Sequence, residues 1–353
     1  MTRITNCHVH LFNHRHIPQD YPYRALRFFK RAPFLIRWMA GGLRLIGQHP
    51  AADRLERLYR FNNEAGADTQ AEILDALRAH YPSDTRFVVL PMELSAFGYG
   101  APEVPLAAQH DELADLARAN RGTVIPFATI DPRADPQATE LMRAIDPLGF
   151  RGVKLYPRMG FSPTDPRLME HVYPELERRG LPVMTHCSRG GLMGRDMSEY
   201  SADRYTEPQA YIPVLKAHPN LRICLAHFGG ARDWAAYARP DPNAWDDPAQ
   251  RDNWQRRIRA MITSGDYDNL WTDISYTLFN FEDYAPFLRI FLTGDDKASE
   301  RLRSRVLFGS DFYMTRQEKL SEREVCFRLR NTLGEEVFRQ IAEENPARWL
   351  GET

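Results

Sequence analysis

Two histidines, His8 and His10, lie two residues apart in an apolar segment near the N-terminus. Alternate residues of a β-strand project to the same face, so this spacing places two imidazoles side by side. Imidazole nitrogens are ligands of Zn²⁺ and of other borderline transition ions. The pair is weak support for a metal site when taken alone, because two ordinary buried or exposed histidines give the same pattern.

Four further residues with chemical potential end apolar segments elsewhere in the chain. They are Lys154, His186, His227 and Asp311. The carboxyl ends of the strands of a closed parallel barrel meet over one axial cavity, although the residues are far apart in sequence. Each histidine taken alone is more often a satisfied core or surface residue. Together with His8 and His10, the set predicts a metal site at one barrel mouth.

The elements that must position these residues are eight short apolar segments, with helical patterns between them. They span 4–11, 86–93, 123–130, 152–156, 182–187, 222–227, 269–276 and 305–311. Most are continuously apolar rather than alternating, as expected of strands covered on both faces. Eight such βα units predict an α/β fold, a (β/α)₈ barrel whose active site lies at the carboxyl ends of the strands.

Helix signals lie between the predicted strands. Asp165 and Pro166 provide an N-cap and a first-turn proline, and Gly180 ends the helical pattern that follows them. Similar patterns predict helices over 103–120 and 135–146. We expect one barrel domain over residues 1–353, with two insertions that account for its excess over the roughly 250 residues of a typical barrel.

The first insertion, 13–84, follows the first strand, and we expect it to form a helical lid. It has no acidic residue between Tyr21 and Ala52, where basic residues intersperse with aromatic and aliphatic ones. Such a stretch can lie on a membrane surface or bind an acidic partner, but packing on the barrel or on a second subunit is the simpler interpretation. We therefore expect a homo-oligomer. The second insertion, 231–268, follows the sixth strand and borders the same mouth.

Composition excludes several other classes of protein. The chain has 46 basic and 47 acidic residues, a formal net charge of -1, and no motif for nucleic acid. The four cysteines form no CxxC pair, so we expect free thiols and a cytoplasmic protein, with Cys7 and Cys187 turned toward the helices. No leader segment and no apolar run of about 18 residues is present, so we expect neither a signal peptide nor a transmembrane segment.

Four motifs share one resemblance. They are His8-Val-His10, the segment from His218 to His227 with the following Phe-Gly-Gly, Leu307-Phe-Gly-Ser-Asp311-Phe, and Glu344-Asn-Pro-Ala-Arg-Trp-Leu-Gly351. They resemble the amidohydrolase superfamily, and more closely its amidohydrolase-related (amidohydrolase 2) branch of metal-dependent hydrolases and decarboxylases. The resemblance runs nearly end to end and covers the first insertion least. It implies a (β/α)₈ fold with one or two divalent metals at the mouth.

The resemblance also implies roles for individual residues. His8, His10, His186 and Asp311 correspond to metal ligands, and His227 to a second-metal ligand or to an acid/base group. Lys154, in Gly-Val-Lys154-Leu-Tyr-Pro, resembles the carboxylated lysine that bridges two metals in dihydroorotases. An unmodified Lys154 is a poor ligand beside cations and instead can hold a substrate carboxylate or pair with a carboxylate such as Asp273.

The chemistry expected of this set is hydrolysis of a small amide, lactone or related carbonyl substrate. A divalent ion lowers the pKa of bound water and polarises the carbonyl. Asp311 would act as general base and then as proton donor. Zinc is the leading candidate, although the ligand types also suit Mn, Fe or Co. The alternative is non-oxidative decarboxylation, with Asp311 or His227 delivering a proton to carbon. A barrel that serves only as a binding or structural protein is disfavoured, because every expected ligand type is present.

Substrate contacts are expected just beyond the strands. The candidates are Tyr156, Arg158, Arg189, Tyr276 and Asn280. Arg158 and Arg189 can fork onto a carboxylate, which favours a small anionic substrate. They can equally pair with the acidic second insertion.

Overall fold

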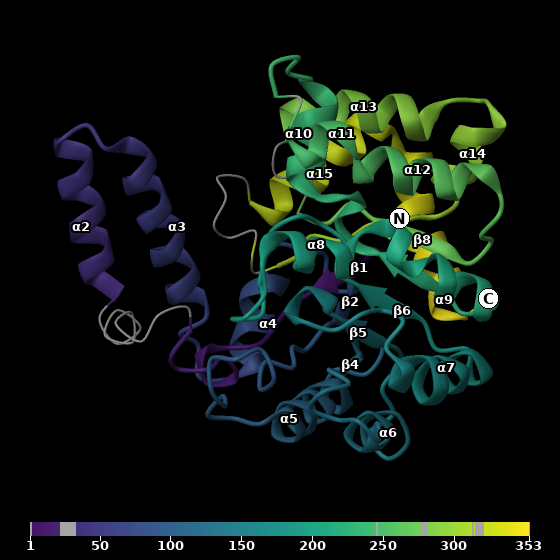
Figure 1. The fold of residues 1–353 in the computed structure, drawn as a ribbon, viewed down its shortest axis with the longest axis horizontal. Coiled ribbons are helices and arrows are strands. Elements are labelled where there is room, and N and C mark those ends of the chain that lie inside the picture. The colour runs from purple at the N-terminus through teal and green to yellow at the C-terminus, as the bar shows by residue number, and fades with distance from the viewer. Residues whose placement is uncertain are drawn as a thin grey trace.

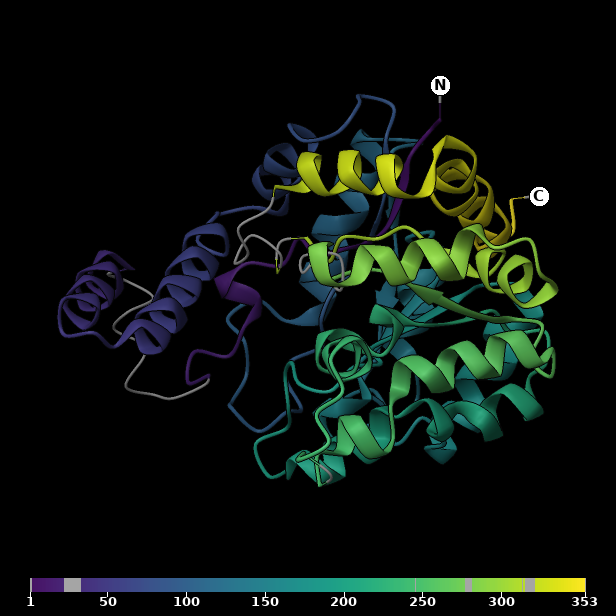
Figure 2. The same ribbon diagram turned by 90° about the horizontal axis from the view of Figure 1, so that it is seen from above.

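The computed structural model describes residues 2–21, 33–244, 246–276, 281–312, 314 and 321–352 (Figures 1 and 2). Within these residues, nine short parallel strands form the centre of the molecule. They are β1 (Thr5–Val9), β2 (Arg86–Val89), β3 (Val124–Pro126), β4 (Ala128–Thr129), β5 (Val153–Leu155), β6 (Val183–Thr185), β7 (Ile223–Leu225), β8 (Leu270–Asp273) and β9 (Val306–Leu307). Each of the eight predicted segments contains one strand, except 123–130, which contains two.

The strands pair in the orders β1-β2-β3 and β4 to β9, all parallel. The predicted third strand is interrupted at Phe127, after Pro126, which lacks a backbone N–H. The Phe127 N–H still donates to the Val89 carbonyl at 3.0 Å, so the hydrogen bonding to β2 extends past the end of β3. At the other seam, the Cys7 N–H donates to the Phe308 carbonyl at 2.9 Å, which joins β1 to β9 and closes the barrel.

Helices surround this barrel (Figures 1 and 2). Those after β2 are α5 (Leu106–Ala119), α6 (Thr139–Ile145), α7 (Tyr173–Arg179), α8 (Glu199–Thr206), α9 (Ile212–Ala217), α10 (Gly230–Ala238), α11 (Pro248–Arg251), α12 (Trp254–Ser264), α13 (Phe281–Thr293), α14 (Lys297–Arg303), α15 (Glu322–Leu333), α16 (Glu335–Arg339) and α17 (Asn345–Leu350). The helices predicted over 103–120 and 135–146 are confirmed as α5 and α6. Gly180 ends α7 in the left-handed conformation, as its sequence position predicts.

The barrel interior is filled by residues that share a face with Lys154. Met184, Cys224 and Trp271 lie in register with it across β6, β7 and β8. Cys7 packs in the same buried cluster, so the prediction that it faces the helices is wrong. The pairing of β1 with β2 shifts register between Asn6 and Val9, and such a bulge changes the direction in which the following side chains point. The four cysteines are free and buried.

The first insertion contains the helices α2 (Pro33–Leu45), α3 (His49–Glu64) and α4 (Gln70–Arg78). α2 and α3 form a hairpin that stands away from the barrel (Figures 1 and 2). Its root is held just after β1, where the His14 N–H donates to the Ala65 carbonyl at 2.8 Å and the Asn13 amide donates to the Asp68 carbonyl at 3.0 Å. A lid role for this insertion stays a prediction. No helix among the described residues is long and apolar enough to cross a bilayer.

Candidate metal centre

Three predicted ligands meet beyond the end of β1. The Nε2 atoms of His8 and His10 lie 3.5 and 3.2 Å from Oδ1 of Asp311. One ligand atom from each of the three residues lies within 4.8 Å of the others, and all three residues are buried. β1 contributes His8, the residue after β1 is His10, and the chain that follows β9 contributes the carboxylate. Residues some 300 positions apart therefore form one compact group because the barrel closes at the seam between β9 and β1.

The other ring nitrogen of each histidine is already engaged. His8 Nδ1 donates to Asp273 Oδ2 at 2.8 Å, and His10 Nδ1 donates to the Leu90 carbonyl at 2.7 Å. These acceptors assign the proton to Nδ1 and leave the Nε2 lone pairs directed at Asp311. A carboxylate or carbonyl behind each imidazole is the usual arrangement around metal-binding histidines.

Asp273 is a candidate site residue that the sequence predicts only as a possible partner for Lys154. It ends β8, and its Oδ1 accepts the His227 N–H at 2.8 Å and the Ser275 N–H at 3.1 Å. Asp273 thus orients His8 and fixes the backbone of His227. The signal that could identify Asp273 is a carboxylate at the end of a buried strand. Asp311, which follows β9, is identified by the same kind of signal.

His186 and His227 form the second part of the cluster. His186 Nδ1 lies 3.1 Å from His227 Nε2, and the His186 ring stacks on Tyr156 with centroids 4.2 Å apart. His186 Nε2 faces the Gly190 carbonyl at 3.2 Å, while His227 Nδ1 faces Ser275 Oγ at 2.9 Å. These two rings therefore contact each other and atoms of the loops that follow the strands.

The backbone is strained at three strand ends around the cluster. His227, Tyr276 and Asp311 have φ of 67°, 59° and 66°, the left-handed region that residues with a Cβ rarely adopt. They are three of the five described non-glycine residues with positive φ. Strain of this kind persists where surrounding contacts force it, and it concentrates at functional sites.

Burial sets the protonation states of these groups. It lowers the pKa of His8 to about 3, with the charge of Lys154 acting in the same direction, and it also lowers the pKa of His186 and His227. Burial by itself would raise the pKa of Asp311, but the adjacent His10 and the surrounding imidazoles bring it to about 2. At neutral pH His8, His186 and His227 are therefore neutral and Asp311 is charged, the forms in which these side chains bind metals.

Lys154 projects into the same space. Its side chain is buried, and Nζ lies 3.2 Å from His8 Nε2, so the amine donates to the lone pair that a metal would use. Burial lowers the pKa of Lys154 to about 8. A fraction of the Lys154 amine is therefore neutral, and it lies next to a ligand position. These surroundings are compatible with both forms of Lys154 expected from the sequence, the unmodified and the carboxylated one.

The candidate substrate contacts have different surroundings. Arg158 is fully buried and pairs with Glu199 and Asp203 of α8. Arg189 pairs with Asp203 at 3.0 Å and with Asp233 of α10 at 3.1 Å, and its guanidinium lies 4.2 Å from the Trp254 ring centroid. Both guanidinium groups therefore already have carboxylate partners.

The tyrosines lie nearer the cluster. The Tyr156 hydroxyl accepts the Leu192 N–H at 3.0 Å while the ring stacks on His186. Tyr276 follows β8 and is partly exposed. Asn280 lies outside the described residues.

A comparison with protein families decides the family of this chain. The model of the amidohydrolase family (Amidohydro_2) matches residues 5–351. The chain belongs to the amidohydrolase-2 family. The match covers all six predicted residues of the cluster and both insertions, and it agrees with the resemblance found in the sequence motifs. A comparison with curated proteins gave no significant match.

Solved structures share the fold of this amidohydrolase-2 chain. An uncharacterised TIM-barrel protein from Bordetella bronchiseptica has a TM-score of 0.57 at 19% identity, with 99% of each chain covered. The 5-carboxyvanillate decarboxylase LigW from Sphingomonas paucimobilis has a TM-score of 0.55 at 15% identity, again with 99% of each chain covered. The 2,6-dihydroxybenzoate decarboxylase from Rhizobium has a TM-score of 0.54 at 17% identity, covering 83% of this chain and 92% of its own. At these identities the likeness confirms the (β/α)₈ barrel.

The candidate ligand atoms of this amidohydrolase-2 chain fit the metal on which the family depends. Once Nδ1 carries the proton, His8 Nε2, His10 Nε2 and Asp311 Oδ1 are acceptors that face one another. Adjacent acceptors repel, and a cation bound between them removes the repulsion. His8, His227 and Asp273 form a second group of possible ligands that shares His8.

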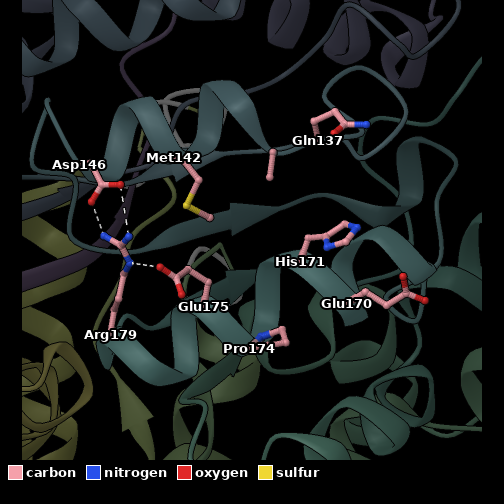
Figure 3. A pocket seen from close by; sticks show the side chains of 9 residues that line it. Gln137, Met142, Asp146, Glu170, His171, Pro174, Glu175 and Arg179 are labelled. Atoms are coloured by element: carbon pink, nitrogen blue, oxygen red, sulfur yellow. Dashed lines mark hydrogen bonds and ion pairs between the residues drawn. The ribbon is translucent and has the colours of Figure 1, made fainter.

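The polar groove drawn in Figure 3 is separate from this centre. It lies on the outer helical layer, between α6 and the helical segment that contains α7, and its lining includes Met142, His171 and Arg179. Arg179 within it already pairs with Asp146 and Glu175. The groove contains none of the predicted site residues.

Proposed function

We propose that this chain is a metal-dependent hydrolase that cleaves a small, anionic amide, lactone or related carbonyl substrate. The observation that carries the proposal is the arrangement of His8, His10 and Asp311, whose three acceptor atoms converge while Asp273 and the Leu90 carbonyl hold the opposite ring nitrogens. Fixing the tautomer and the ring orientation in this way favours binding of a cation, and packing alone does not require it.

His8, His10, His186 and Asp311 are the proposed ligands. When bound, a divalent ion polarises the scissile carbonyl and makes water acidic enough to attack at neutral pH. We propose one ion, zinc first and Mn, Fe or Co next, because Lys154 as described is an amine within hydrogen-bond distance of His8. A carboxylated Lys154 would add a second ion, with His227 as a further ligand.

The side chains then move protons. Asp311 is charged at neutral pH, so it can accept a proton from the attacking water and return it to the leaving nitrogen or oxygen as the C–N or C–O bond breaks. His227 is neutral and lies next to His186, where it can donate to the developing oxyanion.

The anionic part of the substrate is assigned to Lys154. Arg158 and Arg189 are occupied by Glu199, Asp203 and Asp233, so the buried amine is the described cation nearest the cluster that can take a carboxylate. Lys154→Met should raise KM for anionic substrates more than for their neutral esters.

Decarboxylation is the second candidate. Two structures of similar fold are described as decarboxylases, of 5-carboxyvanillate and of 2,6-dihydroxybenzoate. In that reaction, the C–C bond to the carboxylate breaks, CO₂ leaves, and carbon gains a proton. His227 can supply that proton directly, whereas Asp311 can supply it only after taking one from water or from a substrate hydroxyl. Both reactions use the same residues, so the products must distinguish them.

The deciding experiment incubates the metal-loaded chain in H₂¹⁸O with two panels, small anionic lactones and amides, and hydroxylated aromatic acids. Hydrolysis predicts ¹⁸O in the product carboxylate and no CO₂. Release of CO₂ in proportion to substrate consumed would contradict the hydrolase proposal. Asp311→Asn with metal still bound should lose turnover, and full turnover by that variant would refute the base assignment.

A further inference from the structure

The helix α2 presents two opposite apolar sides. Ile36 and Ala40, four residues apart, are buried on the side that α3 adjoins. Phe34, Trp38 and Leu45 lie on the opposite side, because they follow one another at intervals of four and seven residues, and they are 59%, 79% and 90% exposed. Met39 and Ile46 widen the exposed side.

This exposed side is large for a protein that works alone. If an exposed large side chain presents about 150–250 Å² when it is fully free, the five residues together offer on the order of 600 Å². The largest apolar patch on a typical monomer is roughly 300–600 Å², and a stable interface takes about 800 Å² from each partner. The α2 side therefore supplies most of what one half of a dimer interface needs.

Charge favours a protein partner over a lipid surface. α2 has only two charged residues among 13, Arg37 and Arg44. Arg44 is neutralised within the hairpin, where it pairs with Asp53 at 3.1 Å and with Glu56 at 2.8 Å. Helices that bind anionic membranes carry many free cations beside the apolar face, whereas a helix that is apolar nearly all round is buried in protein.

Shape favours a second copy of the same chain. Gly41 and Gly42 lie between Trp38 and Leu45, and a Cβ added at either position would meet nothing within 4 Å, so the α2 side has a recess between two large side chains. An identical surface turned by a two-fold axis offers a large side chain for each recess. The hairpin stands away from the barrel, so a second hairpin can reach it (Figures 1 and 2).

We propose that the α2 surface, made of Phe34, Trp38, Met39, Gly41, Leu45 and Ile46, is where a second copy of this chain docks. The hairpins of the two copies pack as a four-helix bundle, which buries the apolar side of each α2. The hydrogen bonds of His14 and Asn13 at the root hold each hairpin to its own barrel.

Sedimentation velocity of the metal-loaded full chain, over a wide range of concentration, tests this proposal. The wild type should be a dimer, and Trp38→Glu should weaken dimerisation by roughly thirtyfold or more, since central aromatic residues dominate interfaces. Phe327→Glu is the matched control, because Phe327 on α15 is 75% exposed and lies outside the hairpin, and it should leave the dimer intact.

Leu45→Glu provides a second variant at a side chain that is 90% exposed, where folding does not depend on the native residue. Circular dichroism and metal content should match the wild type for every variant compared. A monomeric wild type would overturn the proposal. If the monomer also floated with phosphatidylserine vesicles in a flotation assay, the α2 surface would be assigned to a membrane instead. A dimer unaffected by both variants would also overturn it.

Discussion

The two parts of the histidine cluster use the same side chain but hold it differently. His8 and His10 each have one ring nitrogen fixed by a buried acceptor and the other directed at Asp311. His186 and His227 face each other across 3.1 Å and contact loop atoms and Ser275. The first part is preorganised for one purpose, whereas the second can ligate a metal, donate a proton or orient substrate.

This difference teaches that residue type alone does not assign a role at a barrel mouth. A histidine supported by a carboxylate or carbonyl behaves as a fixed ligand, because its tautomer and ring plane are set before metal binds. A histidine supported by another histidine keeps a choice of tautomer, which is what a proton donor needs. We therefore expect variants in the two parts to fail in different ways.

The largest effect is expected from His10→Ala. Losing this ligand should abolish stoichiometric metal binding. Because the metal stabilises the transition state by several kcal/mol, kcat/KM should fall by at least about a thousandfold. Metal analysis and steady-state kinetics measure both quantities. His171→Ala, at an exposed histidine on the outer layer, should change neither. Retention of metal by His10→Ala would remove the distinction between the two parts.

His227→Asn should separate catalysis from metal binding. The metal content should stay near that of the wild type, while kcat falls about 10²–10⁴-fold because a positioned proton donor is lost. Metal content and kcat measured on the same preparation test this. If the variant loses half of a two-metal complement, His227 is a ligand and belongs with the first part.

Asp273→Asn tests the support rather than the ligand. An amide oxygen can still accept from His8 Nδ1 but carries no charge, so we expect metal affinity to fall by about 10–100-fold with the fold retained. Competition with a chelator measures the affinity. Thr272 adjoins Asp273 on β8, and Thr272→Ser keeps its hydroxyl and is the control. Unchanged affinity would show that the carboxylate does not hold His8 for metal.

His16 shows what burial does to a histidine outside both parts. Burial lowers its pKa to about 4, with Arg15 acting in the same direction. Between about pH 6 and 5 the unfolded chain binds a proton at this site that the folded chain does not. Stability should therefore fall as pH falls, by about 1 kcal/mol per pH unit from this group.

His16→Gln removes this titration. Urea denaturation of wild type and variant at the two pH values should show a shallower pH dependence for the variant. Identical slopes would mean that His16 titrates as it does in the unfolded chain.

Much of the fold and part of the site could be predicted from the sequence. The eight apolar segments contain every strand of the described residues, because a strand buried on both faces leaves a continuous apolar run. His8, His10 and Asp311 were found because each is polar where such a run should stay apolar. The acceptors of the His8 and His10 Nδ1 protons could not be predicted. Asp273 and the Leu90 carbonyl come from other parts of the chain, and only the packing of the strands brings them to the rings.

The remaining differences have similar causes. The bulge in β1 depends on its pairing with β2, so the alternation of residues could not reveal that Cys7 turns inward. Arg158 and Arg189 follow strands, as substrate contacts do, but their partners Asp203 and Asp233 lie on helices that the strand pattern does not place. Local sequence indicates which residues can do chemistry, and tertiary contacts decide which are already occupied.

The measurement that tests the central claim most directly is anomalous X-ray diffraction from crystals of the metal-loaded chain, collected at the absorption edges of Zn, Mn, Fe and Co. The account predicts a strong peak within bonding distance of His8 Nε2, His10 Nε2 and Asp311, with His186 completing the site. A metal-loaded crystal whose peak lies away from these atoms, or a chain that takes up no divalent metal at saturating concentration, would contradict it.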